Sequence, residues 1–218
     1  MTLTQRIKVT STILALLISG SLPAFAKNAS HHAKPTIIEI KTAQTAATLR
    51  DLWVGHGFWV RVLVTETLAG NTAAVANAEN QAIANAKQIA ASIEPFYGKA
   101  ASEKLFTLLG GHYAGVKQYL GAAVKGDQLK QDIAQKAMVA NGGEIAVFLS
   151  SANPNLPVET LRGMLLAHGG HHIQQIQQLQ SKEYAQEAQT WDAMRTHMYA
   201  IADALAGALS KQFPEKFS

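Results

Sequence analysis

The residues best equipped for chemistry in this sequence are histidines at equal intervals. His112 follows His56 at the same interval at which His168 follows His112, and His172 comes one helical turn after His168. Neutral imidazoles are common ligands for zinc, copper, nickel and iron. Histidines at i and i+4 share one face of a helix, so both rings can reach a single ion. These four residues are therefore predicted to be metal ligands.

The interval that separates these histidines, about 56 residues, also aligns other columns without a gap. Leucine recurs in one column, and isoleucine followed by alanine recurs in another: Leu49, Leu105 and Leu161, then Ile89-Ala90, Ile145-Ala146 and Ile201-Ala202. An alanine-rich chain gives chance matches with itself, but alanine does not explain three coincident histidines. We interpret the pattern as an internal repeat with units at about 45–100, 101–156 and 157–212.

Apolar residues recur at helical spacing along most of the chain, and no convincing strand appears. Turn signals such as Gly70-Asn71, Gly126-Asp127 and Asn153-Pro154 divide residues 45–214 into six helices of roughly 20 residues each. We predict an all-α fold, a single domain formed by a six-helix bundle of three tandem helical hairpins. Residues 27–44, including the apolar stretch Thr36–Ile40, are predicted to be a flexible or extended lead-in.

Helical periodicity places each repeated histidine on the inner face of its helix. Leu49 and Leu52 precede His56 by seven and four residues, so they share its face, and the other two units repeat the pattern. The second helix of each unit has one polar residue at an equivalent inner position: Asn85, Asn141 and His197. A buried imidazole needs partners for both nitrogens, or a ligand that replaces them.

Three arrangements would satisfy such histidines. In the first, the hairpins surround a pseudo-threefold axis and hold one transition metal, with zinc favoured over copper, nickel or iron. In the second, each histidine is structural and bonds its own unit's asparagine, a backbone carbonyl or a buried water, in a non-enzymatic scaffold or small-ligand-binding bundle. In the third, the metal serves a hydrolase or oxygenase with Glu144 as its base. Whether the protein is an enzyme stays open.

Other residues near the histidines are candidates for supporting roles. Trp53 and Trp59 flank His56 and are predicted to pack in the core or to wall a pocket. Arg61 is predicted to pair with an acidic group, bind an anion or lie in solvent. Glu144 is predicted to orient a histidine or to lie at the surface, and the inner polar residues of the second helices are further supporting candidates. His171, His31 and His32 are not predicted as ligands.

The N-terminal segment, residues 1–26, has the pattern of a secretory signal peptide. Arg6 and Lys8 precede an apolar run from Ile13 to Ile18, and Ala24-Phe25-Ala26 matches a signal-peptidase site. We expect cleavage after Ala26 and a periplasmic or secreted mature chain. The apolar run is too short to cross a bilayer, so no stable membrane span is expected after cleavage.

Charge and cysteine content exclude several functions. Of 19 basic and 15 acidic residues, two basic ones precede Lys27, which leaves 17 against 15 in the expected mature chain. This balance, without a cluster of basic and aromatic residues, argues against nucleic-acid binding. The absence of cysteine excludes disulfides, thiolate metal sites and covalent c-type haem. The expected partner is a metal ion or a small molecule, and the sequence indicates no particular protein partner.

Two resemblances to known families arise at these residues. Trp53, His56, Trp59 and Arg61 form W-x2-H-x2-W-x-R, which, with Pro95-Phe96-Tyr97-Gly98, Asn153-Pro154 and Lys211-Gln212-Phe213-Pro214, resembles exported bacterial helical-bundle proteins without a settled function. That resemblance implies a fold and no activity. The pair His168-x3-His172 resembles the H-x3-H motif of DinB-like metalloproteins, which hold a metal with three histidines. It implies these two residues as ligands, with His112 or His56 as the third.

Overall fold

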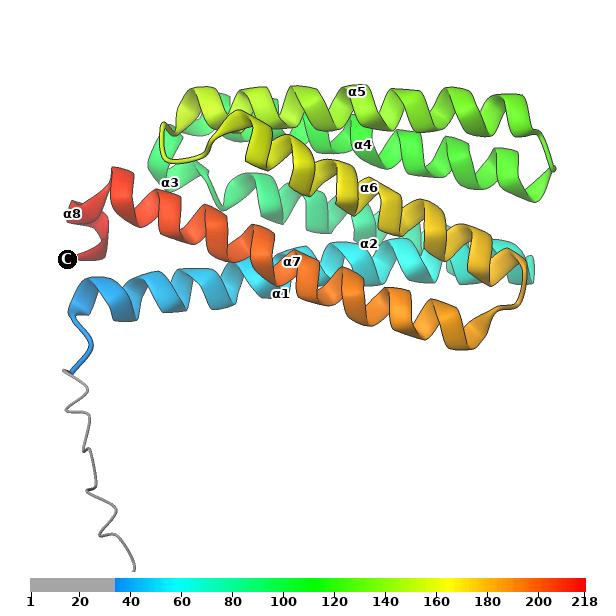
Figure 1. The fold of residues 1–218 in the computed structure, drawn as a ribbon, viewed down its shortest axis with the longest axis horizontal. Coiled ribbons are helices and arrows are strands. Elements are labelled where there is room, and N and C mark those ends of the chain that lie inside the picture. The colour runs from blue at the N-terminus through cyan, green and yellow to red at the C-terminus, as the bar shows by residue number, and fades with distance from the viewer. Residues whose placement is uncertain (1–33) are drawn as a thin grey trace, which may run out of the picture. The chain divides into compact units, whose positions relative to one another are not determined.

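The computed structural model describes residues 34–218, so the predicted signal peptide and His31 and His32 lie outside the described residues. The long helices are α1 (Ile37–Ala69), α2 (Thr72–Ala91), α4 (Lys99–Val124), α5 (Gln128–Ala152), α6 (Val158–Gln180) and α7 (Tyr184–Gln212). Two single-turn helices, α3 (Glu94–Tyr97) and α8 (Pro214–Phe217), lie together at one end of the bundle (Figure 1). The prediction of an all-α bundle with six long helices is confirmed.

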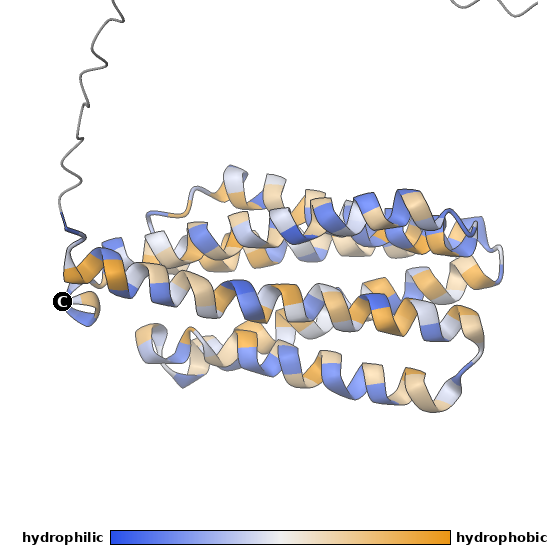
Figure 2. Cartoon of the chain, turned by 90° about the horizontal axis from the view of Figure 1, so that it is seen from below, coloured by the Kyte–Doolittle hydropathy of each residue, from blue (hydrophilic) through white to orange (hydrophobic). Residues whose placement is uncertain are grey.

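The six long helices form a closed ring of neighbours. In chain order α1 packs on α2, α2 on α4, α4 on α5, α5 on α6 and α6 on α7, and α7 returns to α1. Helix α6 also contacts α1 and α4, which brings the helices that carry the predicted ligands together inside the bundle (Figure 1). Polar and apolar residues are mixed along every long helix, as expected for helices that bury one face (Figure 2). None of the described helices is long and apolar enough to cross a membrane.

The turns after α1 and α4 share the same local chemistry. Gly70 and Gly126 have positive φ angles of 73° and 67°, a conformation that glycine adopts without steric cost. The next residue caps the following helix: Asn71 accepts a hydrogen bond from the backbone N–H of Ala74, and Asp127 accepts one from Lys130. These residue types therefore explain why both helices reverse direction where the sequence predicted turns.

The start of α1 differs from the prediction. Residues 37–44 are helical and not part of an extended lead-in, because α1 already begins at Ile37. The Thr36 hydroxyl accepts a hydrogen bond from the backbone N–H of Glu39, and the Glu39 carboxylate accepts one from the backbone N–H of Thr36. This capping box starts the helix even though the isoleucines after it are exposed. At the other end, α8 extends past the predicted boundary at residue 214 and buries Phe217.

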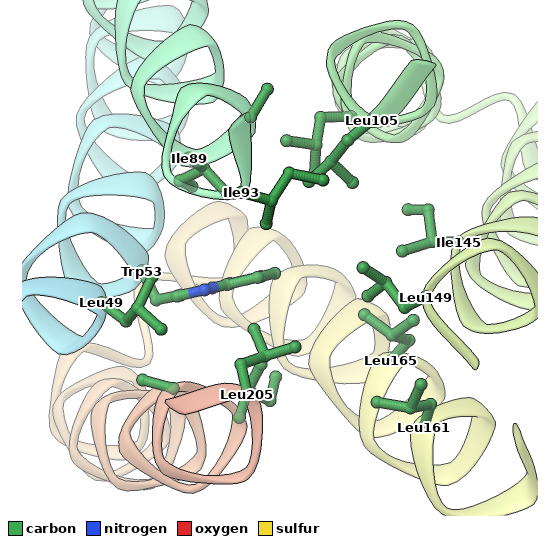
Figure 3. Close-up of a cluster of buried hydrophobic side chains, with 14 of the residues drawn as sticks. Leu49, Trp53, Ile89, Ile93, Leu105, Ile145, Leu149, Leu161, Leu165 and Leu205 are labelled. Carbon is green, nitrogen blue, oxygen red and sulfur yellow. The ribbon is translucent and has the colours of Figure 1, made fainter. Parts of the chain in front are cut away.

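Two apolar clusters fill the bundle, one on each side of a polar layer. The first includes Trp53 on α1, Ile145 on α5 and Leu205 on α7, and the Trp53 indole projects into its middle (Figure 3). The second includes Val60 on α1, Val116 on α4 and Ile176 on α6. On α1, α4 and α6 the four histidines His56, His112, His168 and His172 lie buried between these clusters, and Gly57 and Gln175 are the other buried residues there. The core thus seals a histidine layer between apolar side chains.

Candidate metal centre

Four histidines from three helices converge in the polar layer. Helix α1 supplies His56, α4 supplies His112, and α6 supplies both His168 and His172. Each offers one ring nitrogen, and the four nitrogens all lie within 4.8 Å of one another. The ring centroids are between 4.5 Å apart, for His168 and His172, and 5.9 Å apart, for His56 and His112. The structure therefore brings the four predicted ligands into one cluster.

Burial keeps the four imidazoles neutral. Burial lowers the pKa of His56 to about 3, with a smaller contribution from His112, and it lowers the pKa of His112 to about 4. The pKa values of His168 and His172 also fall well below the ordinary value, first through burial and then through the neighbouring histidines. The neutral ring is the form that binds a metal, so the site needs little proton release before it can take up an ion.

Hydrogen bonds satisfy only some of the ring nitrogens in the cluster. The Nε2 atoms of His168 and His172 lie 3.2 Å apart, so one ring donates to the other. Within the described chain, Nε2 of His56 and His112 and Nδ1 of His168 and His172 are buried without a partner. Each such atom costs about 1–3 kcal/mol. Unsatisfied imidazole nitrogens gathered in one buried layer are a pattern expected where a bound ion or a buried water supplies missing bonds, and Nε2 of His56 and His112 are the two that an ion in the cluster would satisfy.

The inner polar residues of the second helices bond to backbone instead of to these histidines. Each ties its helix to a carbonyl on the preceding long helix, four residues before a cluster histidine; the pairs are Asn85–Leu52 at 2.9 Å, Asn141–Leu108 at 3.1 Å and His197–Met164 at 2.7 Å. These residues therefore fix the spacing of the helix pairs around the cluster. The predicted structural role, in which a histidine bonds its own unit's asparagine, is not among the hydrogen bonds observed in the described chain.

Two glycines allow the asparagines to approach this closely. A Cβ atom on Gly111 would lie 2.8 Å from Nδ2 of Asn141, and one on Gly55 would lie 3.1 Å from Nδ2 of Asn85. Both distances are shorter than an ordinary van der Waals contact, so a side chain there would push the amide away from its carbonyl. Each glycine directly precedes a cluster histidine.

The remaining sequence candidates have different surroundings. Trp53 is buried, and its ring meets that of His168 edge-on at 6.4 Å. Trp59 is half-buried and packs on the second apolar cluster, edge-on to Phe58. Of the predictions for Glu144, the surface position is the one observed, because its side chain is exposed in a surface groove that Arg162 also lines.

Arg61 pairs with a buried acidic group, one of the predicted alternatives. Its guanidinium donates to both carboxylate oxygens of Glu187 at 2.6 and 2.7 Å, and Gln175 donates to the same carboxylate at 3.1 Å. The hydrogen bonds from Arg61 hold the pKa of Glu187 below its ordinary value. Sequence reasoning missed Glu187, although it lies on the inner stripe of α7 with Met194 and Met198.

A cavity of about 10 Å³ adjoins the cluster, bounded by Trp53, His56, His112 and His168. A space of this size holds about one water molecule or ion. His171 lies outside the cluster, half-buried, with its ring 5.6 Å from that of His197. The enclosed space beside the four histidines is thus small and suited to a single atom or ion.

Comparison of the chain with protein-family models, with curated proteins and with solved structures gave no match. The two family resemblances drawn from the sequence therefore stay predictions. The four-histidine cluster is therefore the feature from which a function can be inferred.

Proposed function

We propose that this protein binds one transition-metal ion through His56, His112, His168 and His172. The observation that carries the proposal is the convergence of four buried, neutral imidazoles, in which Nε2 of His56 and His112 lack hydrogen-bond partners and Nε2 of His168 and His172 bond each other. A coordinated metal would give Nε2 of His56 and His112 a partner and would replace the bond between His168 and His172. It would also join three helices that are far apart in the sequence.

The dimensions of the cluster fit a single ion. A tetrahedral ion with metal–nitrogen bonds of 2.0–2.1 Å needs ligand nitrogens about 3.4 Å apart. The Nε2 atoms of His168 and His172 are already 3.2 Å apart, and all four nitrogens lie within 4.8 Å. Small inward rotations of the rings on α1 and α4 would complete the coordination.

Metal holding is favoured over catalysis. Within the described residues, the cluster of potential metal ligands consists of histidines and includes no carboxylate. The base expected for a hydrolase or oxygenase, Glu144, is at the surface. Four protein ligands also leave no open position for a substrate, which is typical of a site that stores or carries a metal or stabilises the fold.

We propose in addition that three copies of one helical hairpin, arranged about a pseudo-threefold axis, build the site. Equivalent histidines, equivalent turn glycines and the three side-chain-to-carbonyl ties, each 33 residues apart in sequence, support this interpretation. The signal-peptide pattern of residues 1–26 is the ground for proposing that the protein acts in the periplasm or outside the cell.

Elemental analysis of protein purified without an affinity tag tests the proposal. We expect about one equivalent of metal per chain after reconstitution, and its loss when His56, His112, His168 or His172 is separately replaced by glutamine. His171→Gln is the matched control, because His171 lies on the same helix and outside the cluster. Circular dichroism shows whether each variant keeps its helices. Folded variants that retain metal, or wild-type protein that binds none, would contradict the proposal.

A further inference from the structure

The surroundings of the four histidines distinguish one kind of metal from another. We infer that the site takes up copper(I) in preference to zinc(II) and that the thioether of Met198 makes a weak additional contact to the ion beside the histidines. This inference rests on the proposed metal-binding function. It replaces the zinc favoured by the residue pattern with an ion chosen by charge and ligand softness.

Charge is the first argument. Within residues 34–218, the cluster of potential metal ligands consists of four histidines and includes no carboxylate. Glu187, a buried carboxylate, is already neutralised by the bidentate pair with Arg61. An ion in the cluster would therefore keep its full charge in an apolar interior.

The size of that charge decides which ion is tolerated. The cost of moving an ion out of water grows with the square of its charge, so a divalent ion is penalised about four times as heavily as a monovalent one. Protein zinc sites commonly include thiolate or carboxylate ligands, or a bound hydroxide, that offset the two positive charges. Four neutral imidazoles between two apolar clusters offer no such offset, and this favours a singly charged cation.

Softness is the second argument. Met194 and Met198 are fully buried, one turn apart on the inner face of α7. A Cβ atom added to Gly57, the residue after His56, would lie 3.8 Å from Cγ of Met194, so this part of α7 packs against α1 next to His56. A thioether is a neutral, soft donor that selects copper(I) over hard divalent ions.

The repeat indicates which of the two methionines faces the ion. Met198 follows Gly142 at the interval that separates the repeated histidines, and Gly142 follows Ala86 at the same interval. Ala86 and Gly142 both line the small cavity beside His56, His112 and His168. The repeat thus assigns the equivalent position on α7, Met198, to the same layer, with methionine in place of the small residue.

Anaerobic titration of the metal-free protein tests this inference. Copper(I) is added in competition with bathocuproine disulfonate, and zinc(II) in competition with a chromophoric zinc chelator. We expect copper(I) to bind at least about a thousandfold more tightly than zinc. Met198→Leu should weaken copper(I) binding by about tenfold or more and leave zinc binding unchanged. Met138→Leu is the matched control, because Met138 is buried in the second apolar cluster.

The outcomes distinguish selectivity for copper(I) from metal binding in general. Zinc binding as tight as copper(I) binding, or copper(I) affinity unaffected in folded Met198→Leu, would overturn the inference while metal binding itself stands. Failure of the wild-type protein to bind either ion would overturn the proposed function as well.

Discussion

Protonation of buried imidazoles sets the acid limit of the metal-free protein. His56 and His112 have pKa values of about 3 and about 4 in the folded chain, against 6.5 as the ordinary value. Between these limits the unfolded chain binds protons that the folded chain does not, so acid favours unfolding. The contribution of these two histidines to the free energy of unfolding therefore does not change with pH above 6.5, and it decreases progressively as the pH falls towards 4.

We therefore expect the free energy of unfolding of the metal-free protein to fall between pH 7 and pH 4, by up to about 1.4 kcal/mol per pH unit for each histidine. Urea denaturation at several pH values measures this slope. In His112→Gln the slope should decrease by the contribution of one protonating group, up to about 1.4 kcal/mol per pH unit. An identical slope in the wild type and in this variant would contradict the assignment.

The buried ion pair predicts a large effect from a single charge. Arg61→Ala leaves the carboxylate of Glu187, which is only 1% exposed, without its partner, and should cost about 3–5 kcal/mol of stability. The matched control is Arg50→Ala, which removes a bidentate pair with Asp203 at the surface and should cost less than about 1 kcal/mol. Chemical denaturation compares the two. Equal losses would show that burial does not set the strength of the Arg61–Glu187 pair.

Among individual residues, the sequence predicts those whose type recurs in the repeat and misses those whose type does not. His56, His112 and His168 were identifiable because the same residue type returned on the same helix face, and His172 because it lies one turn after His168. Glu187 and Met198 are residue types that do not recur at the equivalent positions of the other units, so each looks like an ordinary residue of an amphipathic helix. The partner of Arg61 is 126 residues away, a distance at which spacing carries no information.

Among the helices, the contact between α4 and α5 gives the sharpest test of packing. Gly111→Ala would place a Cβ atom 2.8 Å from Nδ2 of Asn141 and displace the amide from the carbonyl of Leu108. We expect a loss of about 1–3 kcal/mol, since an amide is left unsatisfied in the core. Gly110→Ala is the matched control, because nothing lies within 4 Å of its Cβ position.

In that control the better helix propensity of alanine should stabilise the protein by about 0.5–1 kcal/mol. Thermal unfolding of the two neighbouring variants should therefore shift in opposite directions. A shift in the same direction would mean that helix propensity, and not the contact with Asn141, governs both sites.

Helix positions were predictable where apolar periodicity met a strong turn signal, as at Gly70-Asn71 and Gly126-Asp127. The start of α1 was not, because a run of isoleucines resembles a strand and outweighed the capping box of Thr36 and Glu39. The structure resolves that conflict: two reciprocal hydrogen bonds fix the first turn, and the isoleucines stay largely exposed.

For the whole molecule, a metal bound in the histidine layer would link α1, α4 and α6. A ligand that binds only the folded state at about 100 times its Kd adds about 2.7 kcal/mol of stability. In a domain of this size we expect the midpoint of thermal unfolding to rise by about 5–10 °C on metal addition, and to return when a chelator removes the metal. His172→Gln should abolish the shift. A metal-induced shift that persists in this variant would place the binding elsewhere.

The class of the fold and the number of long helices followed from the sequence, but the two short helices α3 and α8 and the neighbours of each helix did not. Apolar stripes show that helices pack without showing on which partner, and the contact of α7 with α1 joins the two ends of the domain. The convergence of the histidines depended on that ring closure, since the same hairpins stacked in a row would have kept His56 and His168 apart.

The contact between α7 and α1 also brings the two ends of the helical domain together. The carbonyl of Ser218 accepts a hydrogen bond from the Lys41 side chain in the second turn of α1, so the last residue lies beside the first helix. The border between α7 and α1 is then a helix–helix contact of the same kind as the borders between α2 and α4 and between α5 and α6. In the described residues, the six long helices thus form a ring in which the chain is interrupted only between α7 and α1. A circular permutant, with the old ends joined and new ends at the turn after Gly126, would be expected to assemble the same four-histidine layer.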